Sequence, residues 1–437
     1  MTIYNLISFC GIFILMALAW LFSDNKRKMN WRVIAWGVIL QILIAFFVFI
    51  VPAGSKFFLF LNDLVGKILN SASAGSEFIF GRLALSPGQT NGAGEGSLGF
   101  ILAFQGFPTI IFFSALINIL YFCNIMPIII RTFSTMFTKL MKVSGAESLV
   151  TASNIFMGIE SNLTVKPHIK KMTRSEFCTI LTAGMATIAA NVLSLYVFTL
   201  REQFPTITAH LMAASLLSAP AAIVMSKIMV PETETPKTLG VHIHPHYDKD
   251  SSLFETIIKG ANEGLKMVVG IVALLIAVLG LVSLFDLFLG FLGGKMNTVF
   301  HWQFIWSLKN ILGYIFYPLT WILGVPAQDV SIISKIIGER MVVTEVVAYK
   351  DLAEALKQHL LTDPRSAVIA TYALCGFAHL ASMAIFVGGI SALAPERTAT
   401  ISKVAFQALI AATLACLMTA CVAGAFFTNT SLLLTAP

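Results

Sequence analysis

Long stretches of the chain contain no Asp, Glu, Lys or Arg, and this feature most limits what it can fold into. A helix of about 20 mostly apolar residues is enough to cross a lipid bilayer, and each of these stretches is about that long or longer. They are residues 3–22, 33–51, 98–130, 177–200, 208–226, 267–285, 366–395 and 404–437. The sequence therefore predicts about eight transmembrane helices.

The composition excludes a soluble protein of this length. Of the 437 residues, 57% are hydrophobic and only 12% are charged, and the mean hydropathy is +0.84. Soluble domains are typically about 25% charged. The net charge of +7 is spread over short loops, so no nucleic-acid partner is expected. The predicted fold class is an all-α polytopic membrane protein surrounded by the lipid bilayer.

The chain ends and the cysteines fit this class. The first apolar run has no basic residue before it and is followed by Lys26-Arg27-Lys28. This order predicts an uncleaved first span in the cell inner membrane, with the N-terminus outside. Alternating the spans from there also places the C-terminus on the periplasmic or extracellular side. The six cysteines lie in apolar stretches without paired spacing, which predicts neither disulfides nor a zinc site.

Two further segments mix polar and apolar residues at membrane depth. Residues 154–168 lie between apolar pieces too short to cross, and both flanks are basic. They predict a re-entrant hairpin opened from the cytoplasm. Residues 331–364 predict a second hairpin, opened from the opposite side. We also expect an outer interfacial helix at the start of 56–97 and an inner one over 131–142.

A short internal repeat relates the two halves of the chain. Residues 184–190 (GMATIAA) parallel residues 376–382 (GFAHLAS), and each follows a hairpin and an Arg-Ser pair. Inverted repeats with broken helices are typical of secondary transporters, although small residues also serve simple helix packing. The expected domains are scaffold helices in 1–130, a first transport repeat in 131–230, a cytoplasmic linker in 231–262, a scaffold span and outer helix in 263–325, and a second transport repeat in 326–437.

Three ionisable side chains are candidates for function. A charged residue at membrane depth costs about 2.5–3.5 kcal/mol on insertion, so such residues are functional candidates by default. Glu160 and Glu345 each belong to one hairpin, and His379 belongs to the second member of the repeat. The alternatives are that each acid caps a half-helix or pairs with a nearby base, and that the histidine only packs. Asn154 and Thr187 add neutral oxygens suited to a partly dehydrated sodium ion.

Three motifs carry a family resemblance. Residues 338–349 read G-E-R-M-V-V-T-E-V-V-A-Y, residues 375–382 read C-G-F-A-H-L-A-S, and the first hairpin opens with Asn154-Ile155-Phe156 followed by Gly158. They resemble G-x-K-x-x-x-N-E-F-V-A-Y, C-G-F-A-N-L-S-S and N-I-F-x-G-Q-T-E-A-P of the concentrative nucleoside transporter family. The resemblance runs nearly end to end.

The resemblance implies a function and a set of residues. It implies nucleoside uptake by cation symport with alternating access, in a homotrimer whose scaffold holds a moving transport domain. No cofactor is implied beyond the coupling ion, sodium or alternatively a proton. The implied substrate-binding residues are Gly158, Glu160, Ser161, Glu345, Phe377, His379 and Ser382. The implied sodium ligands are Asn154 and Thr187 with the carbonyls of Met157 and Ile188.

The first hairpin departs from the family pattern. Where the family has Gly-Gln-Thr-Glu-Ala-Pro, this chain has residues 158–163, G-I-E-S-N-L, and one residue fewer before Lys166. Ile159 cannot replace the Gln amide, and His379 and Thr344 each replace an Asn. The solute is therefore open between an ordinary nucleoside and another polar or modified-nucleoside solute on the same fold.

Two other classes are less favoured. An intramembrane enzyme could use the two acids and the histidine for general acid–base chemistry, but the chain shows no nucleophile motif or cofactor site. A passive channel conflicts with the opposed hairpins, which indicate alternating access.

Overall fold

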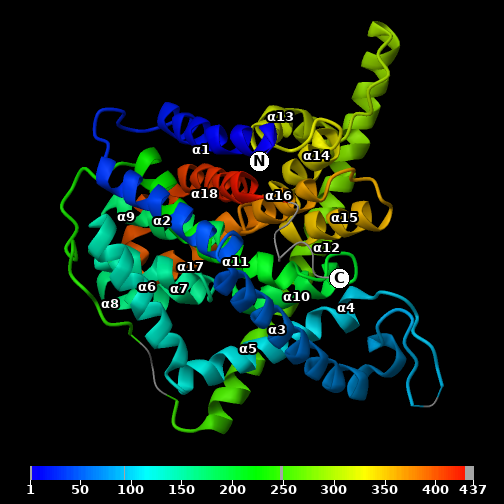
Figure 1. The fold of residues 1–437 in the computed structure, drawn as a ribbon, viewed down its shortest axis with the longest axis horizontal. Helices are drawn as coiled ribbons and strands as arrows, with labels where there is room; N and C mark the ends of the chain where they lie inside the picture. Colours follow the sequence, from blue (N-terminus) through cyan, green and yellow to red (C-terminus); the bar gives the residue numbers. More distant parts are fainter. Residues whose placement is uncertain (1, 93, 247–249, 429–437) are drawn as a thin grey trace.

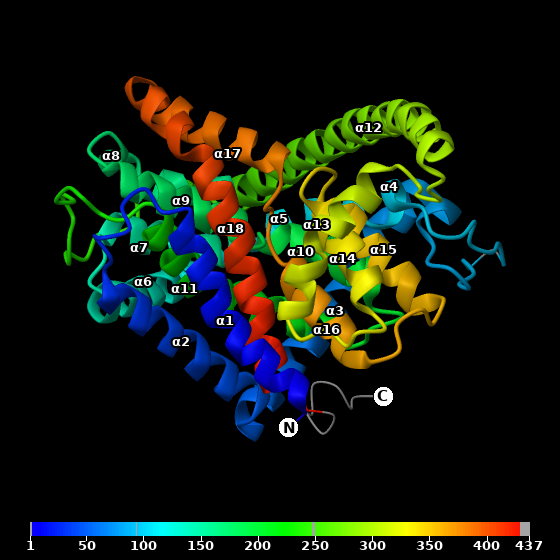
Figure 2. The ribbon, with the colours of Figure 1, turned by 90° about the horizontal axis from the view of Figure 1, so that it is seen from above.

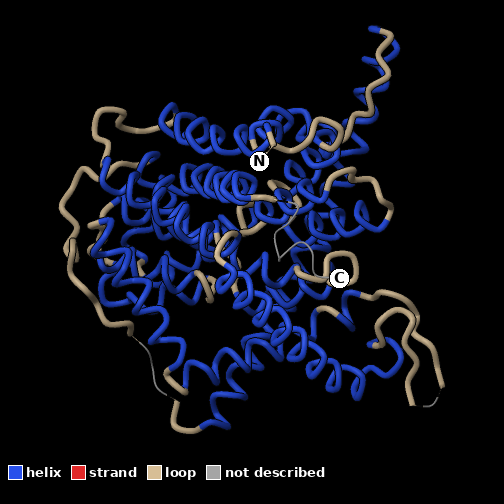
Figure 3. Tube along the Cα trace, in the orientation of Figure 1, coloured by secondary structure: helices blue, strands red, loops and turns tan. Residues whose placement is uncertain are grey.

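In the computed structural model, which describes residues 2–92, 94–246 and 250–428, the chain is almost entirely helical (Figure 3). Within those ranges there is no β-strand, only isolated bridges. The helices, with η marking 3-10 helices, are α1 (Ile3–Leu21), α2 (Trp31–Phe49), α3 (Pro52–Phe80), η1 (Gly81–Ala84), α4 (Leu102–Gln105), α5 (Phe107–Phe122), α6 (Ile125–Met141), α7 (Gly145–Asn154), η2 (Ile159–Val165), α8 (Lys166–Ile169), α9 (Arg174–Ala186), α10 (Ala190–Leu200), α11 (Ile207–Met229), α12 (Leu253–Phe300), α13 (Leu308–Ile322), α14 (Val330–Arg340), α15 (Glu345–Lys357), α16 (Pro364–Leu374), α17 (Leu380–Leu393), η3 (Pro395–Arg397) and α18 (Thr398–Phe426).

Most of the predicted spans are present as long apolar helices. Among the described residues, 7 helical stretches are long and apolar enough to cross a membrane, and each corresponds to a predicted span. The end of the last predicted span, residues 429–437, lies outside the described ranges. Two predicted spans are each formed by two helices: the span over 177–200 by α9 and α10, and the span over 366–395 by α16 and α17. The all-α polytopic fold class is confirmed, with these two spans corrected to broken ones.

Two interruptions of helices coincide with the internal repeat. Residues Thr187–Ala189, here break 1, separate α9 from α10, and residues Cys375–His379, here break 2, separate α16 from α17. Thr187 leaves the helix with extended backbone, at φ −112° and ψ 165°. Gly376 turns the chain in break 2 at φ +126°, a conformation that favours glycine. The repeat therefore marks two non-helical points within the helical body.

A hairpin tip contacts each break through the backbone. Hairpin 1 consists of α7, a tip at residues 155–158, η2 and α8, and the amide of Ala190 donates to the carbonyl of Phe156 at 3.0 Å. Hairpin 2 consists of α14, a tip at residues 341–344 and α15, and the amide of Leu380 donates to the carbonyl of Met341 at 3.2 Å. In both halves, the first residue of the helix after a break is bonded to a hairpin tip.

Local hydrogen bonds fix where hairpin 1 begins. Ser144 caps α7 and accepts from the amide of Glu147 at 3.3 Å, while the Glu147 carboxylate accepts from the amide of Ser144 at 2.8 Å. This reciprocal pair satisfies backbone donors that a helix start leaves free. Lys227 Nζ of α11 lies 2.7 Å from Glu147 Oε2, so the base of hairpin 1 is tied to the helix behind it.

Helix α12 is longer than one membrane span. Its 48 residues extend about 72 Å at 1.5 Å per residue, and its end projects beyond the other helices (Figure 1). It packs on α5 at Gly260 and Gly264, where an added Cβ would lie 2.7 Å from the Cα of Ala115 and of Ile111. Because Ser252 caps it, this helix begins inside the linker predicted for 231–262, whose last residues are therefore helical.

Other boundaries also differ from expectation. The surface helix predicted for 131–142 is the second part of α6, and the interfacial helix expected after Lys56 is the 29-residue α3. Helices α9, α11 and α18 are mostly buried at the centre of the molecule, whereas α12 is mostly exposed. In Figure 2, α18 runs through the middle beside α1, and the two helices pack together. The breaks and tips thus lie among buried helices.

Candidate functional site

Four buried side chains meet where hairpin 2 contacts break 2. Nε2 of His379 lies 2.8 Å from Oε2 of Glu345 and 2.8 Å from Oγ of Ser382. The hydroxyl of Tyr196, from α10, donates to Oε1 of Glu345 at 2.6 Å. Only 3% of Glu345 and 2% of His379 is exposed. We call Glu345, His379, Ser382 and Tyr196 the Glu345 cluster.

The ends of two helices position this cluster. Glu345 is the first residue of α15, and His379 is the N-cap of α17. Nδ1 of His379 accepts from the amide of Ser382 at 3.3 Å, so the neutral ring carries its proton on Nε2, facing the carboxylate. The cluster therefore offers carboxylate and hydroxyl acceptors beside imidazole and hydroxyl donors, which is suited to a ligand carrying hydroxyl groups.

The backbone of break 2 leaves no room for a larger residue at its turn. A Cβ on Gly376 would lie 2.7 Å from the carbonyl oxygen of Ala186 and 2.9 Å from that of Met185. Break 2 therefore packs directly on the end of α9, beside break 1. Phe377, the next residue, is only partly buried. The two unwound segments form one central region.

The residues predicted to hold sodium lie where hairpin 1 contacts break 1. Asn154 is completely buried at the end of α7 and accepts from Ser161 Oγ at 3.0 Å, while its Nδ2 has no hydrogen-bond partner among the described residues. Thr187 and Ile188 form the start of break 1 and are buried, and Met157 lies in the tip. Neutral side-chain oxygens and unwound carbonyls of this kind suit sodium in transporters.

Glu160 does not belong to the Glu345 cluster. It lies in η2 and lines a separate cavity of about 470 Å³, whose charged lining includes Lys166, Lys259 and Glu263. Gly158 lies beside it, with an ideal Cβ position 3.3 Å from Glu160 Oε2. Ile159 points elsewhere, because a Cβ on Gly389 of α17 would lie 2.1 Å from Ile159 Cδ1. The predicted substrate residues thus fall into two groups.

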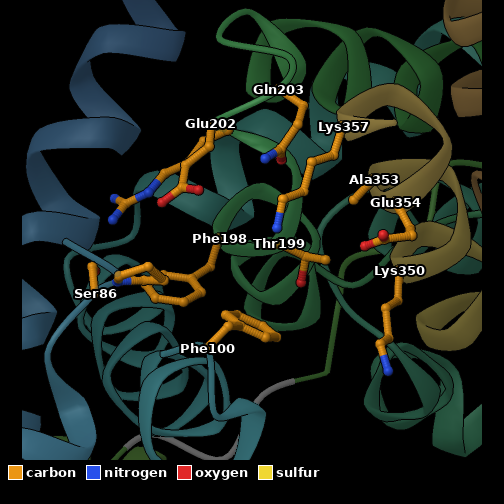
Figure 4. Close-up of a pocket in the computed structure, with 12 residues that line it drawn as sticks. Ser86, Phe100, Phe198, Thr199, Glu202, Gln203, Lys350, Ala353, Glu354 and Lys357 are labelled. Atoms are coloured by element: carbon orange, nitrogen blue, oxygen red, sulfur yellow. The ribbon is translucent and has the colours of Figure 1, made fainter. Parts of the chain in front are cut away.

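A second pocket lies apart from both groups. It has a volume of about 180 Å³ and is lined by residues of α10, α15 and the segment that includes Ser86 and Phe100. Figure 4 shows the side chains of Lys350 and Lys357 from α15 around it, with Phe198 from α10. None of the predicted site residues lines this pocket.

Sequence reasoning missed one member of the Glu345 cluster. Tyr196 stands in an apolar stretch, and its only signal is that a buried tyrosine hydroxyl usually needs a partner. The alternative that Glu345 pairs with a nearby base is not supported by Arg340, whose Nη1 donates to the carbonyl of Ala373 at 2.5 Å. The contacts recorded for Glu345 are with Tyr196 and His379.

Opposed hairpins that contact broken helices are the architecture typical of secondary transporters. Comparisons with known proteins identify the family. Residues 210–424 match the model described as Na+ dependent nucleoside transporter C-terminus, residues 10–83 match its N-terminus, and residues 103–203 match the model for nucleoside recognition. The chain is 33% identical to nucleoside permease NupC of Helicobacter pylori, over 97% of this chain and 98% of that protein. The chain belongs to the concentrative, Na+-dependent nucleoside transporter family.

A mammalian relative and a solved structure support the same family assignment. Solute carrier family 28 member 3 of Mus musculus is 36% identical over 96% of this chain. The chain spans only 58% of that longer protein. The structure of CNTnw in an inward-facing substrate-bound state superposes with a TM-score of 0.85 at 31% identity, covering 97% of this chain and 98% of CNTnw.

Proposed function

We propose that this protein takes up nucleosides across the cell inner membrane by sodium symport, through alternating access of the two hairpins. The observation that carries the proposal is the Glu345 cluster. A buried carboxylate that already accepts from a hydroxyl can accept equally from a ribose hydroxyl, and Ser382 and His379 can bind the neighbouring one. Phe377 of break 2 would contact the same ligand.

The ion site is proposed at the other break. Asn154 and Thr187 supply side-chain oxygens there, and Met157 and Ile188 supply carbonyls. One ion and one nucleoside bound at adjacent breaks would couple ion entry to uptake. A single charge moved through about 100 mV contributes about 2.3 kcal/mol. A proton gradient is the alternative driving force.

The wider organisation is also part of the proposal. Domain boundaries are proposed as expected from the sequence, except that α12 begins at Leu253. We propose a homotrimer, with both chain termini on the outer side. In this arrangement the scaffold helices stay fixed while the repeats carrying the hairpins move.

A second candidate solute has specific support. Glu160, Gly158 and Ser161 belong to hairpin 1, but Ile159 packs on α17 rather than offering a polar group. Glu160 instead lines a cavity with basic and acidic neighbours. These contacts favour another polar solute or a modified nucleoside. Such a solute would have the same ribose-like part at the Glu345 cluster and a different chemical group facing hairpin 1.

Uptake into proteoliposomes tests both candidates. Labelled nucleosides, their 2′,3′-dideoxy analogues and free bases are presented under separately imposed sodium, proton and voltage gradients. The proposal expects sodium-driven uptake that is lost with the ribose hydroxyls. Equal uptake of the dideoxy analogue would contradict the role of the Glu345 cluster. Sodium-driven uptake of another hydroxylated solute, with no uptake of any standard nucleoside, would favour the second candidate.

A further inference from the structure

Arg340 is a charged side chain at the centre of the protein that the proposed function does not use. It is the last residue of α14, next to the tip of hairpin 2, and none of its surface is exposed. Nη1 donates to the carbonyl of Ala373 at 2.5 Å. Nε and Nη2 have no hydrogen-bond partner among the described residues. Apart from this carbonyl and the neighbouring thiol of Cys416, the described residues offer the buried guanidinium no acceptor.

The nearby carboxylates do not neutralise it. Both oxygens of Glu345 face Tyr196 and His379. Glu339, the preceding residue, lies 2.6 Å from Lys309 instead. Burying a charge without a partner is strongly unfavourable. The buried positive charge of Arg340 therefore indicates a role other than packing.

The carbonyl that binds Arg340 belongs to the end of a half-helix. Ala373 is the next-to-last residue of α16, which stops at break 2. The last carbonyls of a helix lack amide partners, and the helix dipole makes this end attractive to cations. In transporters, such half-helix ends are where coupling cations bind. The guanidinium thus occupies an environment suited to an ion.

The order of the elements, rather than the residue register of the repeat, gives Arg340 a counterpart in the first half. Asn154 is the last residue of α7 in hairpin 1, as Arg340 is the last residue of α14 in hairpin 2. Each is followed by a tip that accepts a backbone hydrogen bond from the helix after a break, from Ala190 or from Leu380. At the last helical residue before the tip, hairpin 1 therefore has the neutral amide of Asn154, and hairpin 2 has the permanent positive charge of Arg340.

We propose that Arg340 is a tethered cation occupying, in the second repeat, the place that corresponds to the sodium site of the first. The protein would then couple one sodium ion to each nucleoside, because the second symmetry-related site is filled by its own side chain. This inference rests on the proposed sodium coupling at Asn154 and Thr187.

The test compares the full-length wild type with Arg340→Lys and Arg340→Gln. Arg365→Gln is the matched control, since Arg365 is also buried but bonds the carbonyls of Gly324 and Tyr4. Radioactive sodium binding to the purified protein gives the ions bound per protomer, and the reversal potential in proteoliposomes gives the charge moved per nucleoside. We expect one sodium ion bound per protomer for the wild type, Arg340→Lys and Arg365→Gln. We expect two sodium ions per protomer for Arg340→Gln, whose uptake should rise more steeply with sodium concentration.

Each outcome decides the question. Two ions per wild-type protomer would overturn the inference even if Arg340→Gln fails to fold. Folded Arg340→Gln that binds a single ion would overturn it as well. Sodium-independent uptake by the wild type contradicts the proposed coupling instead. If wild-type uptake does not depend on sodium, sodium binding to Arg340→Gln but not to the wild type still supports a cation site at the position of the guanidinium. If Arg340→Gln then binds no sodium either, the inference is overturned.

Discussion

The hydroxyl of Tyr196 donates to Oε1 of Glu345 at 2.6 Å, across a sequence separation of 149 positions. This bond joins α10, which follows break 1, to α15, the second arm of hairpin 2. His379, at the end of break 2, contacts the other oxygen of the same carboxylate at 2.8 Å. One carboxylate therefore connects elements from both repeats.

Glu345→Gln is expected to abolish uptake while leaving the protein folded. The amide keeps the shape but replaces one acceptor with a donor that faces Tyr196 or His379. A hydrogen bond to a charged group contributes about 1.5–3 kcal/mol, and 1.4 kcal/mol is about tenfold. Initial uptake per folded protein is the measurement, and Glu354→Gln, exposed on the same helix, is the control. Activity within about twofold of wild type would remove Glu345 from the site.

Thr187→Val is expected to weaken sodium activation of uptake by about tenfold, the equivalent of about 1.4 kcal/mol. Valine keeps the size of the buried side chain but removes the hydroxyl oxygen proposed as an ion ligand. The half-saturating sodium concentration at fixed voltage is the measurement. Thr187→Ser, which retains the oxygen, should behave like the wild type. If uptake ignores sodium and follows an imposed proton gradient, the assignment of Asn154 and Thr187 is wrong.

His379 is expected to make uptake sensitive to pH. Histidine changes charge in the range of about pH 5 to 8, and a charged ring donates from both nitrogens. It could then no longer accept from the amide of Ser382. The groups facing the ring are the carboxylate of Glu345 and the hydroxyl of Ser382, with Tyr196 bonded to the same carboxylate.

The comparison is His379→Asn against the wild type between about pH 5.5 and 8, with ion gradient and voltage held fixed. Asparagine has no charge to gain, so the variant should transport with the flatter profile. Superimposable profiles would assign His379 to packing alone.

Gly376→Ala is expected to lower the stability of the purified protein. A Cβ would lie 2.7 Å from the carbonyl oxygen of Ala186, and the residue has φ +126°. Strain and overlap of this kind cost about 1–3 kcal/mol each. The measurement is the thermal unfolding midpoint in detergent. Gly388→Ala, where the added Cβ meets nothing within 4 Å, is the control; an equal midpoint for both variants would contradict this account.

Much of the architecture could be predicted from the sequence because its signals are local. Uncharged stretches mark the spans, since a bilayer accepts few charges. Glu345 and His379 could be singled out as rare ionisable groups at membrane depth, and the GMATIAA and GFAHLAS segments could be recognised as an internal repeat, although the helix breaks at these segments were not predicted. Such patterns depend on neighbours in the chain and on the lipid around it.

Only the tertiary structure decided which of these residues meet. In the structure, Tyr196 donates to Glu345, Glu160 lines a separate cavity, and Ile159 packs against Gly389. The tertiary structure also gave Arg340 a half-helix carbonyl rather than a carboxylate. These contacts join positions far apart in the chain, and side-chain direction at a helix end or tip depends on the packing of buried helices. No local periodicity encodes that packing.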